Sequence, residues 1–396
     1  MLRLLVFLVL LMTSGMASAQ PGDSLSQSAS VSLLTMLPGN EVYSQFGHSG
    51  YHIHDPASGL DKTYNYGTFD FEQPFFVLRF VRGQLDYVLD TAPYELELDK
   101  YAFLRRPMIA QRLALSPETV QSLYDHLETN ALPENRAYRY DFFFDNCSTR
   151  LLDILESALV SSSHGRLTLP EDASSETFRQ LVHPFITDTP LLRLGINLGL
   201  AMPADLDATV RERVFLPVEL MNQFDGASFG GQPLVTATDT VVVVPGYEGE
   251  RAGFDWPKLV LWLVFLAGLA ATISGFVRGR QSTVAGRRGD SFLFAVTGLL
   301  GLIIGILWLG TEHAVTGPNL NLLWAWPTHL LAAWWLRKPS FPPGMRAYLG
   351  AAGIMAIAVI LFWPVLPQAL PAPILPLVLL LALRSFVRVY VRKIAS

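Results

Sequence analysis

The spacing of apolar residues divides the chain into two parts. Before residue 256, apolar residues occur in short runs and alternations that Gly, Pro, Asn and Asp interrupt. This pattern is typical of a soluble domain that buries one face of each element. From Trp256 onward, long apolar runs follow one another. We therefore predict a soluble domain over residues 20–255 and a membrane domain over residues 256–396.

Both strands and helices are predicted in the soluble part. Short alternating or β-branched runs predict strands over residues 31–37, 48–54, 63–71, 84–90 and 234–245. Apolar residues spaced three and four apart predict helices over residues 92–106, 116–130, 147–159 and 205–214. This mixture indicates an α+β domain.

The membrane part contains five predicted spans, at residues 257–277, 291–311, 320–336, 345–365 and 369–387. Each is near the roughly 20 residues that cross a bilayer as a helix, although the third is short and contains Pro327 and His329. Arg and Lys residues follow the first, third and fifth spans, whereas the other two loops carry none. The positive-inside rule then places the soluble domain outside and the C-terminus in the cytoplasm.

Residues 1–19 have the pattern of a secretory signal peptide. Arg3 precedes an apolar core at residues 4–12, and Ala17-Ser18-Ala19 forms a small-residue cleavage site. The apolar core is short for an uncleaved anchor that spans a bilayer. Export of the following residues agrees with the orientation derived from the Arg and Lys residues.

The charge balance and the cysteine count also bear on the class of function. With 16% charged residues and a net charge of −5, the chain gives no indication that it binds nucleic acid. Its one cysteine, Cys147, cannot form an internal disulfide. In an exported protein, an odd cysteine indicates a reactive thiol or an intermolecular partner.

Cys147 lies where a nucleophilic cysteine would be placed. Asp145 or Asn146 is a good N-cap for the helix that follows, and Ser148 comes next, so Cys147 falls in the first turn. There the helix dipole and free backbone N–H groups favour the thiolate and can also hold an oxyanion. A buried, purely structural cysteine is the alternative interpretation.

His48 is the candidate base for this thiol. Small residues, Gly47 and Ser49-Gly50, flank it and leave its ring room, and a surface histidine near a turn is the alternative interpretation. A histidine and a cysteine together can act as base and nucleophile in acyl transfer through a thioester.

Three histidines share one face of the predicted strand, namely His48, His52 and His54. Residues four apart on a strand are separated by ~13 Å, so His48 and His52 cannot bind one ion. His52 and His54 could do so, but no third ligand is evident from the sequence. We predict no metal and no other cofactor.

The outer loop between the second and third spans is a dense polar cluster. It includes Glu312, His313 and Asn319 and lies on the same side of the membrane as Cys147. We expect these three residues to contact a lipid headgroup or the acyl acceptor, and an ordinary solvated turn is the alternative. His329 lies deeper, where a histidine is either functional or part of a hydrogen bond between helices.

Four motifs of the soluble part resemble the N-terminal periplasmic domain of the Lnb-type lipoprotein N-acyltransferases. They are Leu33-Leu34-Thr35 with Pro38-Gly39, Phe46-Gly47-His48-Ser49, Tyr64-Asn65-Tyr66-Gly67-Thr68-Phe69-Asp70-Phe71 and Asp145-Asn146-Cys147-Ser148-Thr149-Arg150. The resemblance covers residues 30–230 and, with residues 316–321 and the apolar spans, most of the chain.

The resemblance implies a circularly permuted papain-like fold, akin to NlpC/P60 and lecithin–retinol acyltransferase domains, followed by an all-α membrane bundle of about five helices. It implies that His48 and Cys147 are the catalytic pair of a multi-pass protein of the bacterial inner membrane. For the third, orienting group we choose Asn65, a polar residue within an aromatic run. Asn146 and Ser148 are the residues that we expect at the oxyanion.

The expected function is transfer of a fatty acyl chain to the N-terminal amine of a diacylglyceryl-cysteine lipoprotein. The donor is a phospholipid or an ester chain of the substrate itself, so the expected partners are phospholipid, lipoprotein N-termini and the membrane. An NlpC/P60-like cell-wall amidase or endopeptidase would use water as acceptor, but it would leave five spans with little to do. A non-enzymatic membrane receptor with a structural Cys147 is the third hypothesis.

Overall fold

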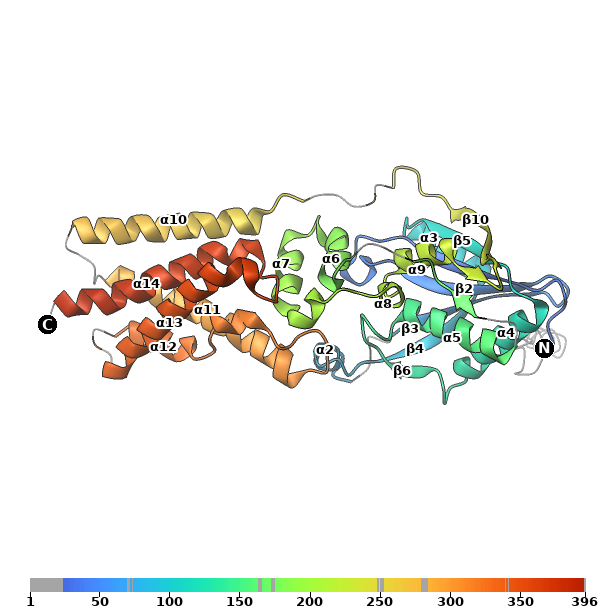
Figure 1. Cartoon of the computed structure of the whole chain (residues 1–396), viewed down its shortest axis with the longest axis horizontal. Helices are drawn as coiled ribbons and strands as arrows, with labels where there is room; N and C mark the ends of the chain where they lie inside the picture. The colour runs from blue at the N-terminus through green and yellow to red at the C-terminus, as the bar shows by residue number, and fades with distance from the viewer. Residues whose placement is uncertain are drawn as a thin grey trace, which may run out of the picture.

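The chain forms a sheet-rich domain at one end of its long axis and a bundle of apolar helices at the other (Figure 1). The computed structural model describes residues 24–69, 72, 74–162, 166–171, 175–247, 249, 253–278, 284–338, 340 and 342–394. The predicted signal peptide at residues 1–19 lies outside these described residues.

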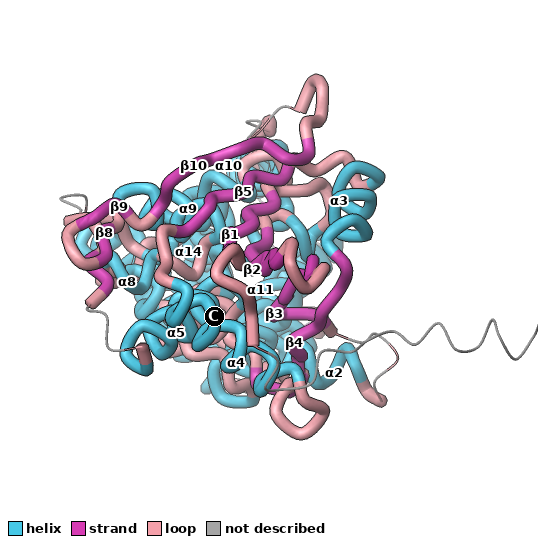
Figure 2. The backbone as a smooth tube through the Cα atoms, turned by 90° about the vertical axis from the view of Figure 1, so that its right-hand side faces the viewer, coloured by secondary structure: helices cyan, strands magenta, loops and turns pink. Residues whose placement is uncertain are grey.

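An antiparallel sheet forms the centre of the soluble part, with seven strands among the described residues in the order β10-β5-β1-β2-β3-β4-β6. The tube in Figure 2 shows β10, β5, β1 and β2 following one another across it. In chain order the strands are β1 (Ser30–Met36), β2 (His48–Asp55), β3 (Leu60–Thr68), β4 (Asp86–Pro93), β5 (Met108–Leu113), β6 (Ala137–Arg139) and β10 (Val235–Val242).

The soluble part also contains helices and short helical turns, some packed on this sheet and others between it and the bundle. They are η1 (Val42–Ser44), α2 (Phe76–Val81), α3 (Tyr94–Phe103), α4 (Pro117–Ala131), α5 (Cys147–Ser161), α6 (Phe178–Val182), η2 (His183–Ile186), α7 (Pro190–Gly199), η3 (Met202–Asp205), α8 (Val210–Arg213) and α9 (Pro217–Gly226). A small second sheet consists of β7 (Leu167–Thr168), β8 (Ser228–Phe229) and β9 (Gln232–Pro233). The helix predicted over residues 205–214 is reduced to α8, which is a single turn.

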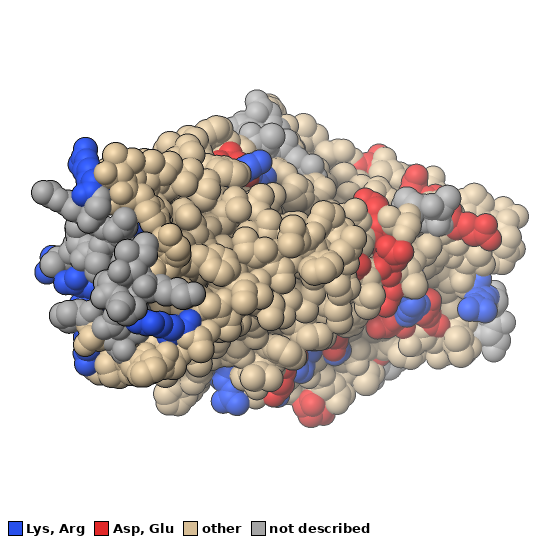
Figure 3. Space-filling view, turned by 60° about the vertical axis from the view of Figure 1, so that its left-hand side comes forward, with Lys and Arg blue, Asp and Glu red and all other residues tan. Residues whose placement is uncertain are grey.

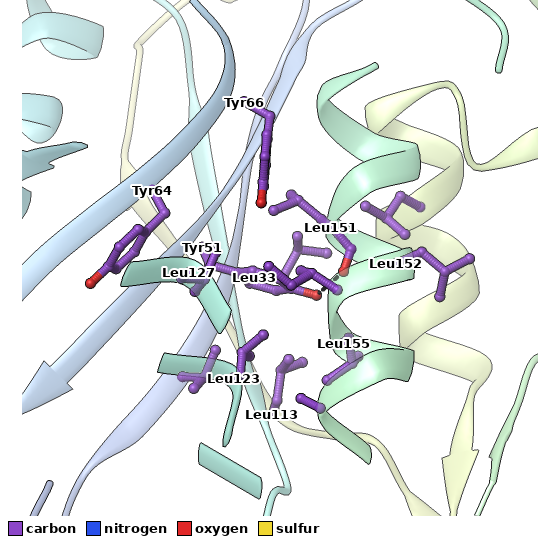
Figure 4. Packing of buried hydrophobic residues seen from close by; sticks show 14 of the residues in the cluster. Leu33, Tyr51, Tyr64, Tyr66, Leu113, Leu123, Leu127, Leu151, Leu152 and Leu155 are labelled. Atoms are coloured by element: carbon purple, nitrogen blue, oxygen red, sulfur yellow. Dashed lines mark hydrogen bonds between the residues drawn. The ribbon is translucent and has the colours of Figure 1, made fainter. Parts of the chain in front are cut away.

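Alternation along the strands sends side chains into two apolar layers. Leu33 of β1 and Tyr51 of β2 are directly paired, fully buried, and face α4 and α5. The Tyr51 hydroxyl donates to the Leu151 carbonyl of α5 at 2.9 Å. Figure 4 shows leucines of α4 and α5 packed around these residues. Leu34 and Met36 point to the opposite face, where they pack with residues of α3. This packing fixes the start of α5 against β2.

Four helices of the described residues are long and apolar enough to cross a membrane. They are α10 (Trp256–Val277), α11 (Val284–Gly310), α13 (Pro343–Phe362) and α14 (Leu375–Ile394), with η5 (Trp363–Val365) and η6 (Ala372–Ile374) between the last two. The view in Figure 3 shows a broad surface of these helices without charge and Lys and Arg residues gathered at the end far from the soluble domain. The positive-inside rule associates such an end with the cytoplasm.

The third predicted span is not one continuous helix. It consists of η4 (Leu320–Leu323) and, after Pro327, the short helix α12 (His329–Leu336). Proline cannot donate the backbone hydrogen bond that would continue a helix. The segment also lies so close to α11 that a Cβ on Gly301 would be 1.9 Å from the Ala325 carbonyl oxygen. The structure therefore has four long helices and this broken segment where we predicted about five spanning helices.

His329 lies in this broken segment and is fully buried. Its Nδ1 lies 2.6 Å from the Tyr348 hydroxyl of α13, and its Nε2 lies 3.1 Å from the Trp324 carbonyl oxygen. The expectation of a hydrogen bond between helices is confirmed.

Buried polar contacts join the two parts of the chain. The Gln368 amide donates to the Leu200 carbonyl at 3.2 Å and accepts from the Leu320 backbone N–H at 2.6 Å. Asn319 donates to the Leu198 carbonyl at 2.8 Å, and the Leu198 side chain packs in the apolar core of the bundle. The segment around α7 therefore lies between the sheet and the bundle, as Figure 1 also shows.

Candidate active site

The first turn of α5 presents Cys147. The predicted capping residue is Asn146, whose side chain accepts from the backbone N–H groups of Ser148 at 2.9 Å and Thr149 at 3.0 Å. The Thr149 hydroxyl in turn accepts from the Asn146 backbone N–H at 2.8 Å, which completes a capping box. These bonds fix the helix start, and Cys147 is its first residue, 8% exposed.

Asp145 and Arg150, on either side of this cap, form an ion pair that contacts Tyr138 of β6. Arg150 donates to both oxygens of Asp145, at 2.5 Å and 2.7 Å. Its guanidinium lies 3.7 Å from the centre of the Tyr138 ring, a cation–π contact. The motif around Cys147 therefore fixes Tyr138 beside the start of α5.

Strand β2 reaches the thiol through the residue after His48. The Ser49 hydroxyl lies 3.0 Å from the Ser148 hydroxyl, which lies 3.8 Å from the Cys147 Sγ. On the next strand, Gly67 has a φ of 95°, and a Cβ placed on it would lie 3.6 Å from the Cys147 Cβ. Glycine is suited to this position because it tolerates positive φ and leaves the space beside the thiol open.

Asn65 is bonded to His48, as the choice of a third group requires. The Asn65 Oδ1 lies 3.3 Å from the His48 Nε2. Gly50 makes this possible, because a Cβ on Gly50 would lie 2.7 Å from that same Oδ1. A carbonyl oxygen can only accept, so His48 carries its proton on Nε2 and leaves the Nδ1 lone pair free. The Asn65 contact therefore favours the His48 tautomer that is protonated on Nε2.

The environment keeps both candidate catalytic groups neutral. Burial, together with the positive charges of Arg106 and Lys100, lowers the pKa of His48 to about 3. Burial also raises the pKa of the Cys147 thiol, and hydrogen bonds from backbone groups, including that of Ser49, offset only part of this effect. The backbone groups of Cys147 and Ser148 at the helix start lower the pKa of the thiol, in the expected direction, but the loss of hydration outweighs them and the net shift is upward.

Slow alkylation of Cys147 at neutral pH is the expected consequence. Only the thiolate reacts, and a raised pKa leaves less of it at pH 7 than in a free thiol. We expect iodoacetamide labelling, followed by intact-protein mass spectrometry, to accelerate with pH up to and beyond about pH 9, the ordinary pKa of a cysteine. The chain has one cysteine, so the label reports this site alone. A rate that is already at its plateau at pH 6, measured against N-acetylcysteine, would instead indicate a thiolate–imidazolium pair.

The three polar residues of the outer loop contact the protein itself. Glu312 accepts from Arg139 at 2.9 Å and from Gln84 at 2.5 Å. The His313 Nε2 lies 3.1 Å from the Val81 carbonyl oxygen. Asn319 is buried and bonded to the α7 segment, as described above. These contacts dock the loop onto the soluble domain, and a contact of the three residues with substrate stays a prediction.

Asp61 is a third residue that could bind a metal beside His52 and His54, and it was not evident from the sequence. Strand pairing sets Asp61 opposite His54, and one ligand atom of each residue lies within 4.8 Å of the others. The Asp61 Oδ1 is 2.6 Å from the His52 Nε2 and 3.3 Å from the His54 Nδ1. The three residues could hold an ion, but hydrogen bonding already accounts for the cluster.

Two further residues lie beside the candidate site and were missed in the sequence. The Tyr138 hydroxyl is buried and has no hydrogen-bond partner among the described residues. A Cβ placed on Gly67 would lie 3.8 Å from this hydroxyl and 3.6 Å from the Cys147 Cβ. The charge of Arg106 acts on both His48 and Cys147. Tyr138 lies within β6, and Arg106 lies just before β5. A single polar residue in or beside a strand does not change the periodic pattern of apolar residues, so the sequence does not single it out.

Two family models match the chain. The model of the Lnb N-terminal periplasmic domain matches residues 22–183, which contain Cys147, His48 and Asn65. The model of the Lnb transmembrane domain matches residues 249–394. No curated protein and no solved structure matches the chain. The two matches follow one another and together span most of the sequence, so this membrane protein with a periplasmic domain belongs to the Lnb-type family.

Proposed function

We propose that this protein is an inner-membrane acyltransferase that moves a fatty acyl chain through Cys147 to the N-terminal amine of diacylglyceryl-cysteine lipoproteins. The observation that carries the proposal is a buried thiol at the start of α5, which lies beside β2. His48, the first residue of β2, is neutral and is hydrogen-bonded to Asn65 of β3. Membership of the Lnb family suggests a lipoprotein-modifying enzyme and supports this assignment. A helix that begins with cysteine and packs on antiparallel strands with histidine and asparagine is also the basis for assigning a permuted papain-like fold.

Contacts between the site and the bundle support a lipid substrate. Phe46, two residues before His48, packs its ring 4.7 Å from Phe142 and 5.9 Å from Phe185. Phe185 leads into α7, whose Leu198 packs in the core of the bundle. The loop just before the base thus packs against the segment that continues into α7 and the membrane part.

The first step acylates Cys147. As the Sγ attacks a phospholipid ester carbonyl, the thiol proton passes to the His48 Nδ1 and a carbon–sulfur bond forms. The ester carbon–oxygen bond then breaks, and His48 returns the proton to the departing glycerol oxygen. The products are the S-acyl enzyme and a lysophospholipid. Its low pKa keeps the His48 imidazole unprotonated before the attack, as a general base requires.

The second step transfers the acyl chain to the lipoprotein. The α-amine of the lipidated cysteine has a pKa near ~8, so a useful fraction is neutral in the periplasm. Its nitrogen attacks the thioester, His48 takes a proton from it, and the carbon–sulfur bond breaks. His48 then returns this proton to the sulfur, and the product is an amide.

The oxyanion of each step needs donors close to the thiol. The amide of Asn146 is already bonded at both ends, since its Nδ2 donates to Phe142 and Phe215 carbonyls and its Oδ1 caps the helix. The Ser148 N–H is bonded to that Oδ1. We therefore assign oxyanion stabilisation to the Cys147 backbone N–H and to the Tyr138 hydroxyl.

A purified-protein experiment tests the proposed function. The full chain in detergent is incubated with a phospholipid of one defined acyl chain and a synthetic diacylglyceryl-cysteine peptide. We expect mass spectrometry to show an acylated Cys147 before the peptide is added and an N-acyl peptide afterwards. A thioester that is lost to water while the peptide stays unmodified would favour a hydrolase, and no acylation of either would reject the proposal.

A further inference from the structure

Arg106 is a buried cation whose guanidinium is only partly bonded. It lies just before β5 and is 7% exposed. Its Nε donates to the Leu37 carbonyl at 3.0 Å, whereas its Nη2 is buried without any hydrogen-bond partner. Among the described residues, no carboxylate forms an ion pair with it.

Burying a charge in this way is costly unless an anion pairs with it. Besides the Leu37 carbonyl, the described residues offer it the face of the Tyr101 ring, whose centre lies 5.1 Å from the guanidinium carbon. Burial accordingly lowers the pKa of Arg106. The surrounding loop is shaped to this side chain, because a Cβ on Gly39 would lie 2.9 Å from the Arg106 Cδ. An arginine kept at such a position is expected to serve a ligand.

Arg106 belongs to the same end of the sheet as the candidate catalytic pair. The Leu37 carbonyl that it binds directly follows β1, whose last residue Met36 is paired with His48. Its charge also acts on His48 and Cys147. An anion bound to the Nη2 would therefore lie at the end of the sheet where the charge of Arg106 acts on the thiol.

Exposed apolar side chains lie in the segments that flank this cation, alongside the exposed Glu41 and Arg105. Val42 and Tyr43, in the loop between Leu37 and His48, are 64% and 66% exposed. Phe103, three residues before Arg106, is 87% exposed. A buried positive charge bordered by exposed apolar side chains suits an amphiphile with an anionic head and hydrocarbon chains, and a small soluble anion would not need the apolar border.

We propose that Arg106 binds the phosphate of the acyl donor, so that the donor is a phospholipid and not an ester chain of the lipoprotein. This inference rests on the proposed function, because it names the donor of that reaction. A guanidinium with a free N–H suits a phosphodiester oxygen. The diacylglyceryl group of the lipoprotein carries no phosphate and offers Arg106 only neutral ester oxygens, with no charge to pair with it.

Donor selectivity tests this assignment. Acylation of Cys147 is measured by mass spectrometry with phosphatidylglycerol and with neutral diacylglycerol of the same chains, in the same micelles. We expect Arg106→Gln to lower the rate with the phospholipid by roughly 10- to 100-fold more than the rate with diacylglycerol, the scale of a lost charge-assisted hydrogen bond, because the effect of its charge on His48 and Cys147 is common to both donors. Arg106→Lys keeps the charge and should restore part of the phospholipid rate.

Lys100→Gln is the matched control, since Lys100 also carries a positive charge that acts on His48 but is exposed and paired with Glu97. It should leave the ratio of the two donors unchanged. An equal loss with both donors, or no loss, in a folded Arg106→Gln protein would overturn the proposal. Stimulation of the diacylglycerol reaction by inorganic phosphate would assign the site to a free anion and overturn it too. Failure of the wild type with every donor would instead reject the proposed function.

Discussion

Lipoproteins from cells that carry only the Cys147→Ala variant are expected to lack the N-terminal acyl chain, as in cells from which the gene is deleted. The variant removes the nucleophile, and no other cysteine in the chain can replace it. Mass spectrometry of lipoprotein N-terminal peptides measures the result, with wild-type complementation as the positive reference. Cys147→Ser should fail as well, because a buried hydroxyl is far harder to ionise than a thiol.

The loss must come from chemistry and not from unfolding. Cys147 forms no disulfide, and its replacement by alanine removes only the Sγ, so we expect the free energy of unfolding to change by about 1 kcal/mol. Equal membrane levels and equal melting temperatures of the variant and the wild type would establish this. Complete N-acylation in the Cys147→Ala cells, with none in the deletion strain, would exclude Cys147 as the nucleophile.

Tyr138→Phe is expected to lower kcat by about 10²- to 10³-fold, the usual effect of losing one oxyanion donor. The hydroxyl has no partner in the structure, so its removal breaks no hydrogen bond and should not lower stability. Burial, with the nearby Cys147 as a further cause, raises the pKa of Tyr138, so the hydroxyl stays protonated and able to donate at neutral pH. Single-turnover acylation of Cys147 from a phospholipid measures the rate.

A structural role of the Tyr138 hydroxyl predicts a different outcome. Tyr87→Phe is the matched control, because Tyr87 is buried in the same aromatic cluster, with its ring 6.5 Å from that of Tyr138. It should keep the wild-type rate. If Tyr138→Phe retains full activity, the hydroxyl is not an oxyanion donor, and if it melts at a lower temperature, its role is structural.

Much of the fold follows from local patterns in the sequence. The strand predicted over residues 31–37 is β1, and the helix predicted over residues 116–130 is α4, because alternation and apolar spacing directly reflect burial. The third span was predicted as a helix because its composition is apolar. Pro327 and the close approach of Gly301 on α11 instead break it, and the second is a tertiary contact that no local pattern contains.

The candidate site was predictable only where its parts are contiguous. The Asn146 cap and the place of Cys147 follow from neighbouring residues, and the structure has both. Asn65 was chosen for its polarity, and strand geometry then brings it to His48. Asp61 could not be joined to His52 and His54 without the register of the hairpin. Likewise, the rise in the pKa of Cys147 depends on enclosure by distant segments, which the helix-dipole argument ignores.

The contacts of Gln368 and Asn319 with the α7 segment determine how far the enzyme can reach. A soluble domain on a free linker could travel to its substrates, whereas one that is clamped to its own membrane bundle works at a fixed height above the bilayer. Under the proposed function, a lipoprotein must then bring its first residue to that height, with its lipid still in or near the membrane. Proteins with a flexible tether after the lipidated cysteine can do so, and a folded body that begins immediately after it would collide with the enzyme.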